Sequence, residues 1–349
     1  MDKKGKPTHI LVIRLSAMGD VAMTVPVLQS VLAKYPEAQI TVLTKKLFLP
    51  IFSGLERVSV YEADVKKRHK GLIGLWRLYQ ELKKLQVDYV ADLHNVLRSR
   101  ILKKYFALDK TPFVQIDKGR SEKKTLTRSK NKIFQQLKST HQRYADVFEN
   151  LGFPVDLSKA ELLKRQSLPD KVIELVGRDA KKWLGIAPFA AHEGKMYPLD
   201  LTKKAIEKLN NTEKYKILLF GGGPMEIQQL EAIQRENKGV VNMAGKLKLS
   251  EELTLISNLD LMLSMDSGNS HLAANYGIPV VTLWGVTHPY AGFYPYNQPI
   301  ENALLADRKQ YPLIPTSVYG NKLPNGYENV MKTITPGQIV AKIEKVLES

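Results

Sequence analysis

The feature of this sequence that most constrains its fold is a repeated alternation of short β-branched runs with amphipathic helical patterns. The run HILVIRL (9–15) is followed by the turn SAMGD, by a helical pattern in VAMTVPVLQSVLAK (21–34) and by a second strand-like run, QITVLTKK (39–46). A strand, a tight glycine turn, a helix and another strand in so short a stretch form a βαβ unit. Because such a unit joins its strands by a crossover, the sequence predicts a parallel sheet.

The same alternation continues in two sets of similar size. In the first half, strands are predicted at VSVYEA (58–63), DYVADL (88–93) and FVQI (113–116), and helices at GLWRLYQELKKL (74–85) and HQRYADVFENLGF (141–153). In the second half, strands are predicted at WLGIAPFA (183–190), YKILLFGGG (215–223), VVNMAG (240–245), DLMLSMD (260–266) and PVVTLWG (279–285). We therefore predict the α/β class, with two Rossmann-like parallel-sheet domains facing across a cleft.

The chain of 349 residues is long enough for two domains of ordinary size. The stretch PVDLSKAELLKRQSLPD (154–170) is interpreted as the passage between an N-terminal domain (1–165) and a C-terminal domain (166–334). TPGQIVAKIEKVLES (335–349) predicts a terminal helix with Thr335 as N-cap and Pro336 at the first helical position. Packing of this helix back on the N-terminal domain is left open.

The basic excess of the chain, +17 overall, is concentrated in its first half. Between Asn95 and Thr140, thirteen Lys and Arg stand against three acids, a net charge of +10. A second basic group lies upstream: Lys66, Lys67, Arg68, His69 and Lys70. Two interpretations stay open, a solvated lysine-rich face or a surface for anionic partners such as nucleic acid, acidic lipid headgroups or a phosphorylated substrate.

Several function classes are excluded by what the sequence lacks. It has no cysteine, so a disulfide framework and a thiolate metal site are excluded, which fits a reducing cytoplasm. No stretch approaches the roughly 18 apolar residues of a membrane span, and we expect a soluble protein. His192 and Glu193 are not accompanied by a further ligand at metal-site spacing, and the sequence has no GxSxG nucleophile elbow.

The loops that follow strands are where an open α/β sheet binds its ligands. In SAMGD, Asp20 is either a helix N-cap or a general base that accepts a proton from a substrate hydroxyl. FGGGPME (220–226) offers helix N-terminal amides to a phosphate, although it is neither a dinucleotide fingerprint nor a P-loop.

A third loop, DSGNSH (266–271), follows the strand DLMLSM. If Asp266 ends the strand and His271 opens the helix, the amides between them can hold an anion; the alternative is a capping turn with a structural histidine. Lys195 follows another strand and is either a surface lysine or a group that neutralises a diphosphate.

Three segments together resemble the bacterial heptosyltransferases of glycosyltransferase family 9: ILVIRLSAMGDVAMTVPVLQSV, DYVADLHNVLRSRIL and MDSGNSHLAANYGIPVVTLWGVTHP. The resemblance implies the GT-B architecture, with acceptor bound by the first domain and nucleotide sugar by the second. It also implies an inverting transfer that needs no metal ion and no cofactor.

Site residues follow from the resemblance in the same way. Asp20 matches the family's general base, Lys195 a lysine on the donor diphosphate, and Glu226 a glutamate on the donor ribose. The donor-binding turn is matched by Asp266, Ser267, Gly268 and His271. We expect the anionic acceptor to be attracted by basic residues, among them Lys66, Arg68, Arg98 and Arg120.

The function predicted is transfer of a heptose, or a similar sugar, from ADP-heptose to a lipopolysaccharide inner-core or related envelope glycolipid. The enzyme is expected in the cytoplasm, with peripheral contact to the inner membrane. Two alternatives stay open: the same fold using a UDP- or GDP-sugar for capsule or O-antigen synthesis, and a basic nucleic-acid-binding protein. The second lacks a basic motif with interleaved aromatic residues, so no nucleic-acid partner is expected.

Overall fold

The computed structural model describes residues 8–177 and 179–348, so Ser349, the last residue of the expected terminal helix, lies outside them. The chain forms two compact units. The first extends to Lys118 and includes Thr140–Leu163, and the second contains Gly119–Ser139 and everything from Lys164 onward. The first unit ends at Leu163, two residues before the boundary expected at 165. Residues 119–139 belong to the second unit, whereas the sequence analysis placed them in the first domain.

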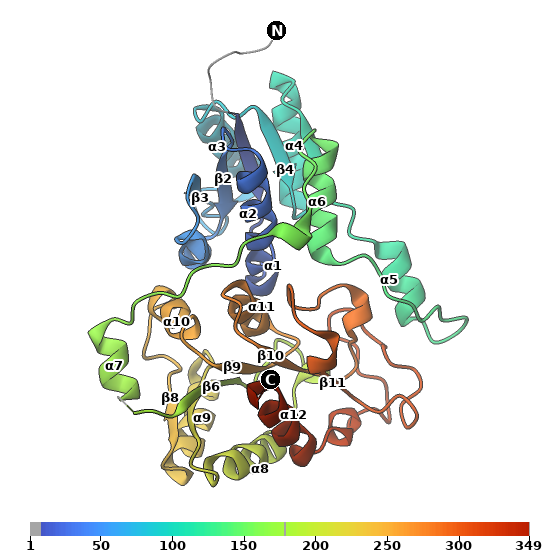
Figure 1. Cartoon of the computed structure of the whole chain (residues 1–349). Helices are drawn as coiled ribbons and strands as arrows, with labels where there is room; N and C mark the ends of the chain where they lie inside the picture. The colour runs from blue at the N-terminus through green and yellow to red at the C-terminus, as the bar shows by residue number, and fades with distance from the viewer. Residues whose placement is uncertain (1–7, 178, 349) are drawn as a thin grey trace. The chain divides into compact units, whose positions relative to one another are not determined.

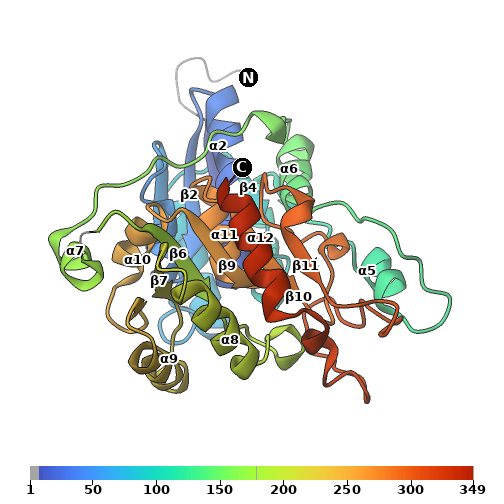
Figure 2. The same ribbon diagram turned by 60° about the horizontal axis from the view of Figure 1, so that its bottom comes forward.

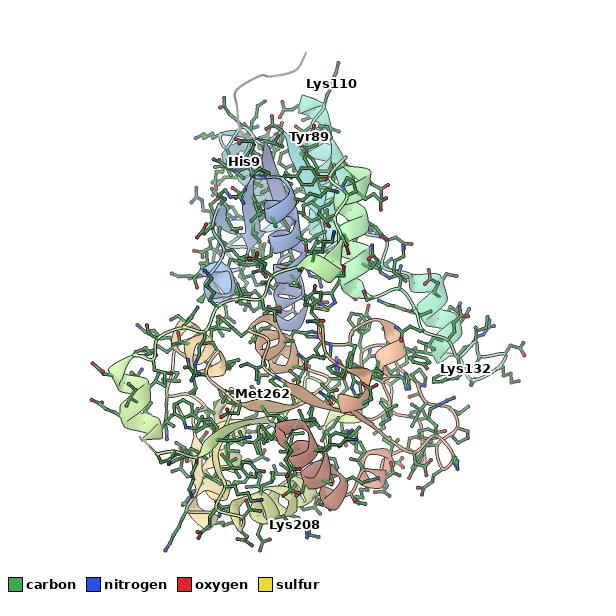
Figure 3. The ribbon with its side chains drawn as sticks, viewed as in Figure 1. His9, Tyr89, Lys110, Lys132, Lys208 and Met262 are labelled. Carbon is green, nitrogen blue, oxygen red and sulfur yellow. The ribbon has the colours of Figure 1, made fainter. Side chains whose placement is uncertain are left out.

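The first unit is built on a parallel sheet which, within the described residues, has five strands in the order β3-β2-β1-β4-β5. The strands are β1 (His9–Ile13), β2 (Gln39–Thr44), β3 (Val58–Glu62), β4 (Tyr89–Asp92) and β5 (Phe113–Gln115). Strand β1 lies at the centre, paired with β2 and β4. In Figure 3, His9 and Tyr89 mark the amino ends of β1 and β4, so the loops that follow these strands lie at the opposite, carboxyl edge of the sheet.

Helices cover both faces of this sheet (Figure 1). They are α1 (Met18–Ala22), α2 (Val25–Lys34), α3 (Gly71–Lys83), α4 (Leu97–Phe106) and α6 (Thr140–Asn150). The single helix expected over 21–34 is thus two helices, and the first begins before Asp20. Pro26 explains the break, because it has no N–H to continue the ladder of α1 and is tolerated in the first turn of α2.

The second unit contains a parallel sheet with the order β11-β10-β9-β6-β7-β8, six strands within the described residues. They are β6 (Lys182–Ala187), β7 (Tyr215–Leu219), β8 (Val240–Asn242), β9 (Leu261–Met265), β10 (Val280–Trp284) and β11 (Ala303–Leu305). The helices are α5 (Arg120–Thr127), α7 (Asp170–Val176), α8 (Leu199–Asn210), α9 (Pro224–Glu236), α10 (Leu249–Ile256), α11 (Gly268–Asn275) and α12 (Pro336–Glu348). Strand β11 was not predicted from the sequence, and neither were helices α4, α5 and α7.

The terminal helix α12 belongs to the second unit, where it packs on α8 and β9 (Figures 1 and 2). Its predicted N-cap is confirmed: Thr335 Oγ1 accepts a hydrogen bond from the Gln338 N–H (3.2 Å), and Gln338 Oε1 accepts one from the Thr335 N–H (2.7 Å). This reciprocal pair satisfies two backbone donors at the helix start. Ile339 and Ile343 are fully buried and anchor the helix.

Residues 119–139 are fastened to the second unit along their length. Leu126 and Leu137 pack with Ala291 in one apolar cluster. The Lys132 ammonium, labelled in Figure 3, donates to the carbonyl oxygens of Leu313 (2.5 Å) and Pro315 (2.6 Å). This segment is therefore part of the second unit's fold although the chain reaches it from the first. Among the described helices, none is both long enough and apolar enough to cross a bilayer.

Candidate active site

Asp20 lies just beyond the carboxyl end of β1, the central strand of its sheet. It is the third residue of α1, whose N-cap is Ala17, so the N-cap interpretation of Asp20 is wrong. Its Oδ2 instead reaches back to accept a hydrogen bond from the Ala17 N–H (3.2 Å). The carboxylate therefore holds a fixed place at the carboxyl edge of the sheet.

Arg14, in the loop directly after β1, is the residue that orders Asp20. Its Nη2 lies 2.5 Å from Asp20 Oδ2, and its Nη1 donates to the Leu93 carbonyl (2.6 Å). Burial alone would lower the pKa of Arg14, but Tyr144 and Asp20 raise it above its ordinary value, so the guanidinium stays charged. Sequence analysis missed this role, although a lone arginine closing a β-branched run was a usable signal.

One oxygen of Asp20 remains for a substrate. Both contacts just described are made by Oδ2, and within the described residues Oδ1 has no hydrogen-bond partner. The side chain is 27% exposed, whereas that of Arg14 is 7% exposed. The pair thus presents an oriented carboxylate with one oxygen free of the Arg14 and Ala17 contacts.

The loop after β4 adds a neutral histidine beside this pair. Asp92 Oδ1 accepts hydrogen bonds from the backbone N–H groups of His94 and Asn95 (2.9 Å each) and so fixes the loop. Burial, together with the nearby charges of Arg14 and Lys118, lowers the pKa of His94 to about 3. His94 is therefore uncharged at neutral pH and adds no cation next to Asp20.

In the second unit, Lys195 and Asp266 form an ion pair with Nζ and Oδ2 2.9 Å apart. Lys195 closes the 3₁₀-helix η4 (Glu193–Lys195) that follows β6, and Asp266 follows β9 directly. Because β6 and β9 are neighbours in the sheet, their carboxyl ends bring the two side chains together. Both side chains are largely buried, which strengthens the pairing.

The turn after Asp266 differs from the expected geometry in one respect. Helix α11 begins at Gly268 with Ser267 as its N-cap residue, so His271 lies inside the first turn and does not open the helix. The Ser267 hydroxyl bonds to the Ser264 hydroxyl (2.9 Å) and makes no cap hydrogen bond to the helix. The first-turn amides of α11 are thus left uncapped by Ser267, as an anion site requires.

Glu226 stands in the first turn of α9, after β7. Its Oε2 accepts a hydrogen bond from the Gly222 N–H (2.7 Å), so this amide of the glycine-rich turn is already occupied by a carboxylate. Strands β9, β6 and β7 are consecutive in the sheet. The loops that carry Asp266, Lys195 and Glu226 therefore line one stretch of its carboxyl edge.

Glycines allow Lys195 to lie where it does, and sequence analysis missed them. A Cβ on Gly320 would stand 2.2 Å from Lys195 Cγ, and a Cβ on Gly285 would stand 2.5 Å from the Gly194 carbonyl oxygen. Gly320 also has a φ of +81°. The aliphatic part of the Lys195 side chain therefore packs against the backbone of Gly320, and this contact fixes the position of the ammonium group.

The basic residues expected on the acceptor fall on both units. Lys66 and Arg68 precede α3 and Arg98 lies in the first turn of α4, but Arg120 begins α5 in the second unit. The basic segment is divided accordingly, with six cations and two acids between 95 and 118 and seven cations and one acid between 119 and 139. His69 is buried with Nε2 3.1 Å from Glu81 Oε2, so it is not part of a surface. The described residues hold no group of three potential metal ligands.

Residues 75–319 match the sequence pattern of glycosyltransferase family 9 (heptosyltransferase). The chain belongs to this family. The lipopolysaccharide core heptosyltransferase OpsX of Haemophilus influenzae is 27% identical over 317 residues, which cover 85% of this chain and 82% of OpsX. The protein is accordingly a glycosyltransferase, as expected from the sequence.

Solved structures of family members share the fold. A family 9 glycosyltransferase from Veillonella parvula superposes with a TM-score of 0.76 at 19% identity, covering 99% of this chain and 98% of its own. The ADP-heptose heptosyltransferase II of Escherichia coli gives 0.71 at 19% identity, covering 98% and 99%. The expected class, two parallel-sheet α/β domains as in GT-B enzymes, is confirmed.

Proposed function

We propose that this enzyme transfers heptose from ADP-heptose to an anionic acceptor of the lipopolysaccharide core, with inversion at the anomeric carbon and without a metal ion. The observation that carries the proposal is kinship, over most of both chains, with a lipopolysaccharide core heptosyltransferase. The solved relative from Escherichia coli is an ADP-heptose enzyme, which supports ADP-heptose as the donor.

In the proposed reaction Asp20 is the general base. Its Oδ1 accepts the proton of the acceptor hydroxyl while that oxygen forms a bond to the anomeric carbon. The bond from this carbon to the diphosphate oxygen breaks on the opposite face, so ADP leaves and the configuration inverts. Arg14 supports this role because it holds the carboxylate by Oδ2.

The donor's charge is compensated by Lys195 and by the first-turn amides of α11. ADP carries more negative charge as it departs, and a nearby ammonium with helix amides stabilises that charge. Asp266 orients Lys195 through the 2.9 Å contact, and the Gly268 position allows close approach of a phosphate. Ser267 and His271 complete the proposed turn, and Glu226 is proposed to bind the donor ribose.

The acceptor is proposed to be drawn by basic residues and to reside at the cytoplasmic face of the inner membrane. Lys66, Arg68 and Arg98 on the first unit and Arg120 on the second are exposed cations suited to phosphates and carboxylates. Arg68 forms an ion pair with Glu81, so its charge is partly neutralised.

A transfer assay with purified enzyme, ADP-heptose and a deacylated, water-soluble inner-core acceptor tests the proposal. We expect ADP release and a heptosylated product of inverted configuration, with the same rate in EDTA. Asp20→Asn should abolish transfer and retain ADP binding, while Glu37→Gln, an exposed carboxylate at the amino edge of the same sheet, should behave as wild type.

Three results count against parts of the proposal. Faster release of UDP or GDP from the corresponding sugars would replace the donor and keep the fold and the base. Loss of activity in EDTA that added metal restores would remove the metal-independent mechanism. Normal turnover by Asp20→Asn would remove Asp20 as the base.

A further inference from the structure

Helix α3 carries apolar side chains on two faces, and the fold explains only one of them. Leu75, Leu78, Tyr79 and Leu82 are buried in the core of the first unit. Outside this buried face, Leu72 is 64% exposed, Ile73 80% and Trp76 41%. Trp76 follows Leu72 by four residues and Ile73 by three, so its side chain is adjacent to both on the first turns of the helix. Single exposed apolar residues are common, but three large ones in contact with water mark an interaction surface.

This apolar group is held rigidly by the neighbouring helix. The Trp76 ring meets the Tyr105 ring of α4 edge-on, with centroids 5.1 Å apart and planes at 84°. Tyr105 Oη donates to the Leu72 carbonyl oxygen (3.4 Å), and Trp76 also contacts Tyr79 at 5.2 Å. The exposed side chains are therefore presented by packed secondary structure and not by a loose loop.

A dense basic group borders the apolar one. Four exposed cations, Lys66, Lys67, Arg68 and Lys70, precede α3, and exposed Arg77 follows Trp76. The stretch from residue 66 to residue 77 contains no Asp or Glu. Five cations and three apolar side chains thus occupy twelve consecutive residues, without an acid between them.

The backbone brings these two groups onto one surface. A Cβ on Gly74 would stand 2.5 Å from the carbonyl carbon of His69, so the basic turn lies directly against α3 at this glycine. Asp64 fixes the same turn by accepting hydrogen bonds from the N–H groups of Lys67 (3.1 Å) and Arg68 (3.3 Å). Since α3 follows β3, this surface lies at the carboxyl edge of the sheet, the edge that also carries Asp20.

We propose that Leu72, Ile73 and Trp76, with Lys66, Lys67, Arg68, Lys70 and Arg77 around them, form a docking surface for an anionic lipid bilayer. The apolar side chains enter the boundary between headgroups and acyl chains, where Trp is favoured, and the cations contact lipid phosphates. Nucleic acid would use the cations but would leave the apolar side chains in water. The inference rests on the proposed function in one respect, that the acceptor is a membrane glycolipid, and it adds the bilayer itself as a partner.

Flotation with phosphatidylcholine vesicles, with and without phosphatidylglycerol and free of any acceptor glycolipid, tests this surface. We expect binding that requires phosphatidylglycerol and weakens with salt. Leu72→Gln with Ile73→Gln should lower vesicle partitioning about tenfold or more, since both side chains lose their insertion energy. Ile300→Gln, at an exposed isoleucine (50%) of the second unit, is the control and should leave partitioning unchanged.

Insertion can be distinguished from surface adsorption by the fluorescence of Trp76. Lipids brominated in the acyl chains should quench the wild type and leave Trp76→Phe unquenched, because Trp284 is 1% exposed and Trp183 is only half-buried at the start of β6, outside the proposed surface. Absence of vesicle binding, absence of quenching, or unchanged partitioning of the double variant would overturn the proposal. The proposal would also be overturned if generic RNA displaced the protein from vesicles and bound the wild type and the double variant with equal affinity.

The water-soluble acceptor separates this inference from the proposed function. The Leu72→Gln, Ile73→Gln variant should transfer heptose to that acceptor at the wild-type rate while failing to bind vesicles. Transfer without any vesicle binding by the wild type would overturn the docking surface alone. Vesicle binding without transfer would overturn the proposed function alone.

Discussion

The guanidinium of Arg14 lies 2.5 Å from the Asp20 carboxylate and simultaneously donates to the backbone of Leu93, at 2.6 Å. One buried side chain thus joins the end of β1, the start of α1 and the loop after β4. This contact fixes the position of a carboxylate that would otherwise sit on a five-residue helix.

We predict that Arg14→Met lowers the turnover number about a hundredfold, because a base displaced by as little as 1 Å loses about that factor. ADP affinity should be unchanged, since the proposed donor groups lie in the second unit. Arg14→Lys should recover only part of the turnover, because an ammonium lacks the two-pronged geometry that reaches Asp20 and Leu93 together. Steady-state kinetics beside calorimetric ADP titration measures both quantities, and a wild-type rate in Arg14→Met would contradict the role of Arg14.

Gly320→Ala should weaken donor binding about tenfold or more through the position of Lys195. The new methyl group would collide with the Lys195 stem, whose Cγ lies 2.2 Å from the ideal Cβ position. The control is Gly326→Ala, since Gly326 has the same φ of +81° but nothing within 4 Å of its Cβ position. Both variants carry the backbone penalty of roughly 1–2 kcal/mol for a left-handed alanine, so their difference in ADP affinity isolates the collision. Equal affinities for the two variants would refute it.

Lys195 and Asp266 should show coupled effects on nucleotide binding. Lys195→Met removes the cation and should weaken ADP binding about tenfold to a hundredfold. Asp266→Asn alone should have a smaller effect, because the ammonium stays but loses its orientation. In the double variant the loss should be less than the sum of the two single losses, measured by calorimetry as a double-mutant cycle. Strict additivity would indicate that Asp266 does not act through Lys195.

Stability should fall on acidification because of His288. Burial, with Arg308 and Lys132 nearby, lowers the pKa of His288 to about 4. The unfolded chain, with an ordinary histidine pKa near 6.5, therefore binds a proton that the folded chain does not between pH 6.5 and pH 4. The free energy of unfolding should drop by about 1.4 kcal/mol per pH unit in this window from this group.

His288→Asn should remove that slope and keep the fold. His288 Nδ1 accepts a hydrogen bond from the Tyr290 N–H (3.1 Å) at the start of a 3₁₀ turn, and asparagine can cap the same turn. Between pH 7 and pH 5 the melting temperature of the wild type should fall further than that of the variant, in which His94, with its pKa lowered to about 3, still costs stability in acid. An unchanged slope in His288→Asn would exclude this source.

Much of the fold could be predicted because strands and helices alternate with distinct periods. Strands β1 to β10 lie within the runs identified from sequence, except that β6 begins one residue earlier, at Lys182. The turn after β9 was found because polar residues interrupt two buried segments. The short edge strand β11 was missed, since three half-exposed residues carry no periodic signal. The break at Pro26 was missed because apolar spacing continues through it, although proline alone could have indicated it.

The candidate site was less predictable, because its supporting contacts join residues far apart in sequence. The pairing of Arg14 with Asp20 spans six residues, but the Leu93 carbonyl that completes it lies 79 residues away from Arg14. Gly320 meets Lys195 through a close backbone approach that leaves no mark in local composition. Likewise, the basic segment reads as one block in sequence, and only tertiary structure divides it between two units.

The excursion of residues 119–139 has a practical consequence for protein engineering. A fragment cut at residue 163 would leave the C-terminal half without Leu126, Leu137 and Lys132, which cover Ala291 and bind the carbonyls of Leu313 and Pro315. Such a fragment should be poorly soluble, and the N-terminal fragment would retain an orphaned basic loop. A chimera that exchanges the second unit with that of another family member must therefore transplant two separate pieces of chain, residues 119–139 and residues 164–349.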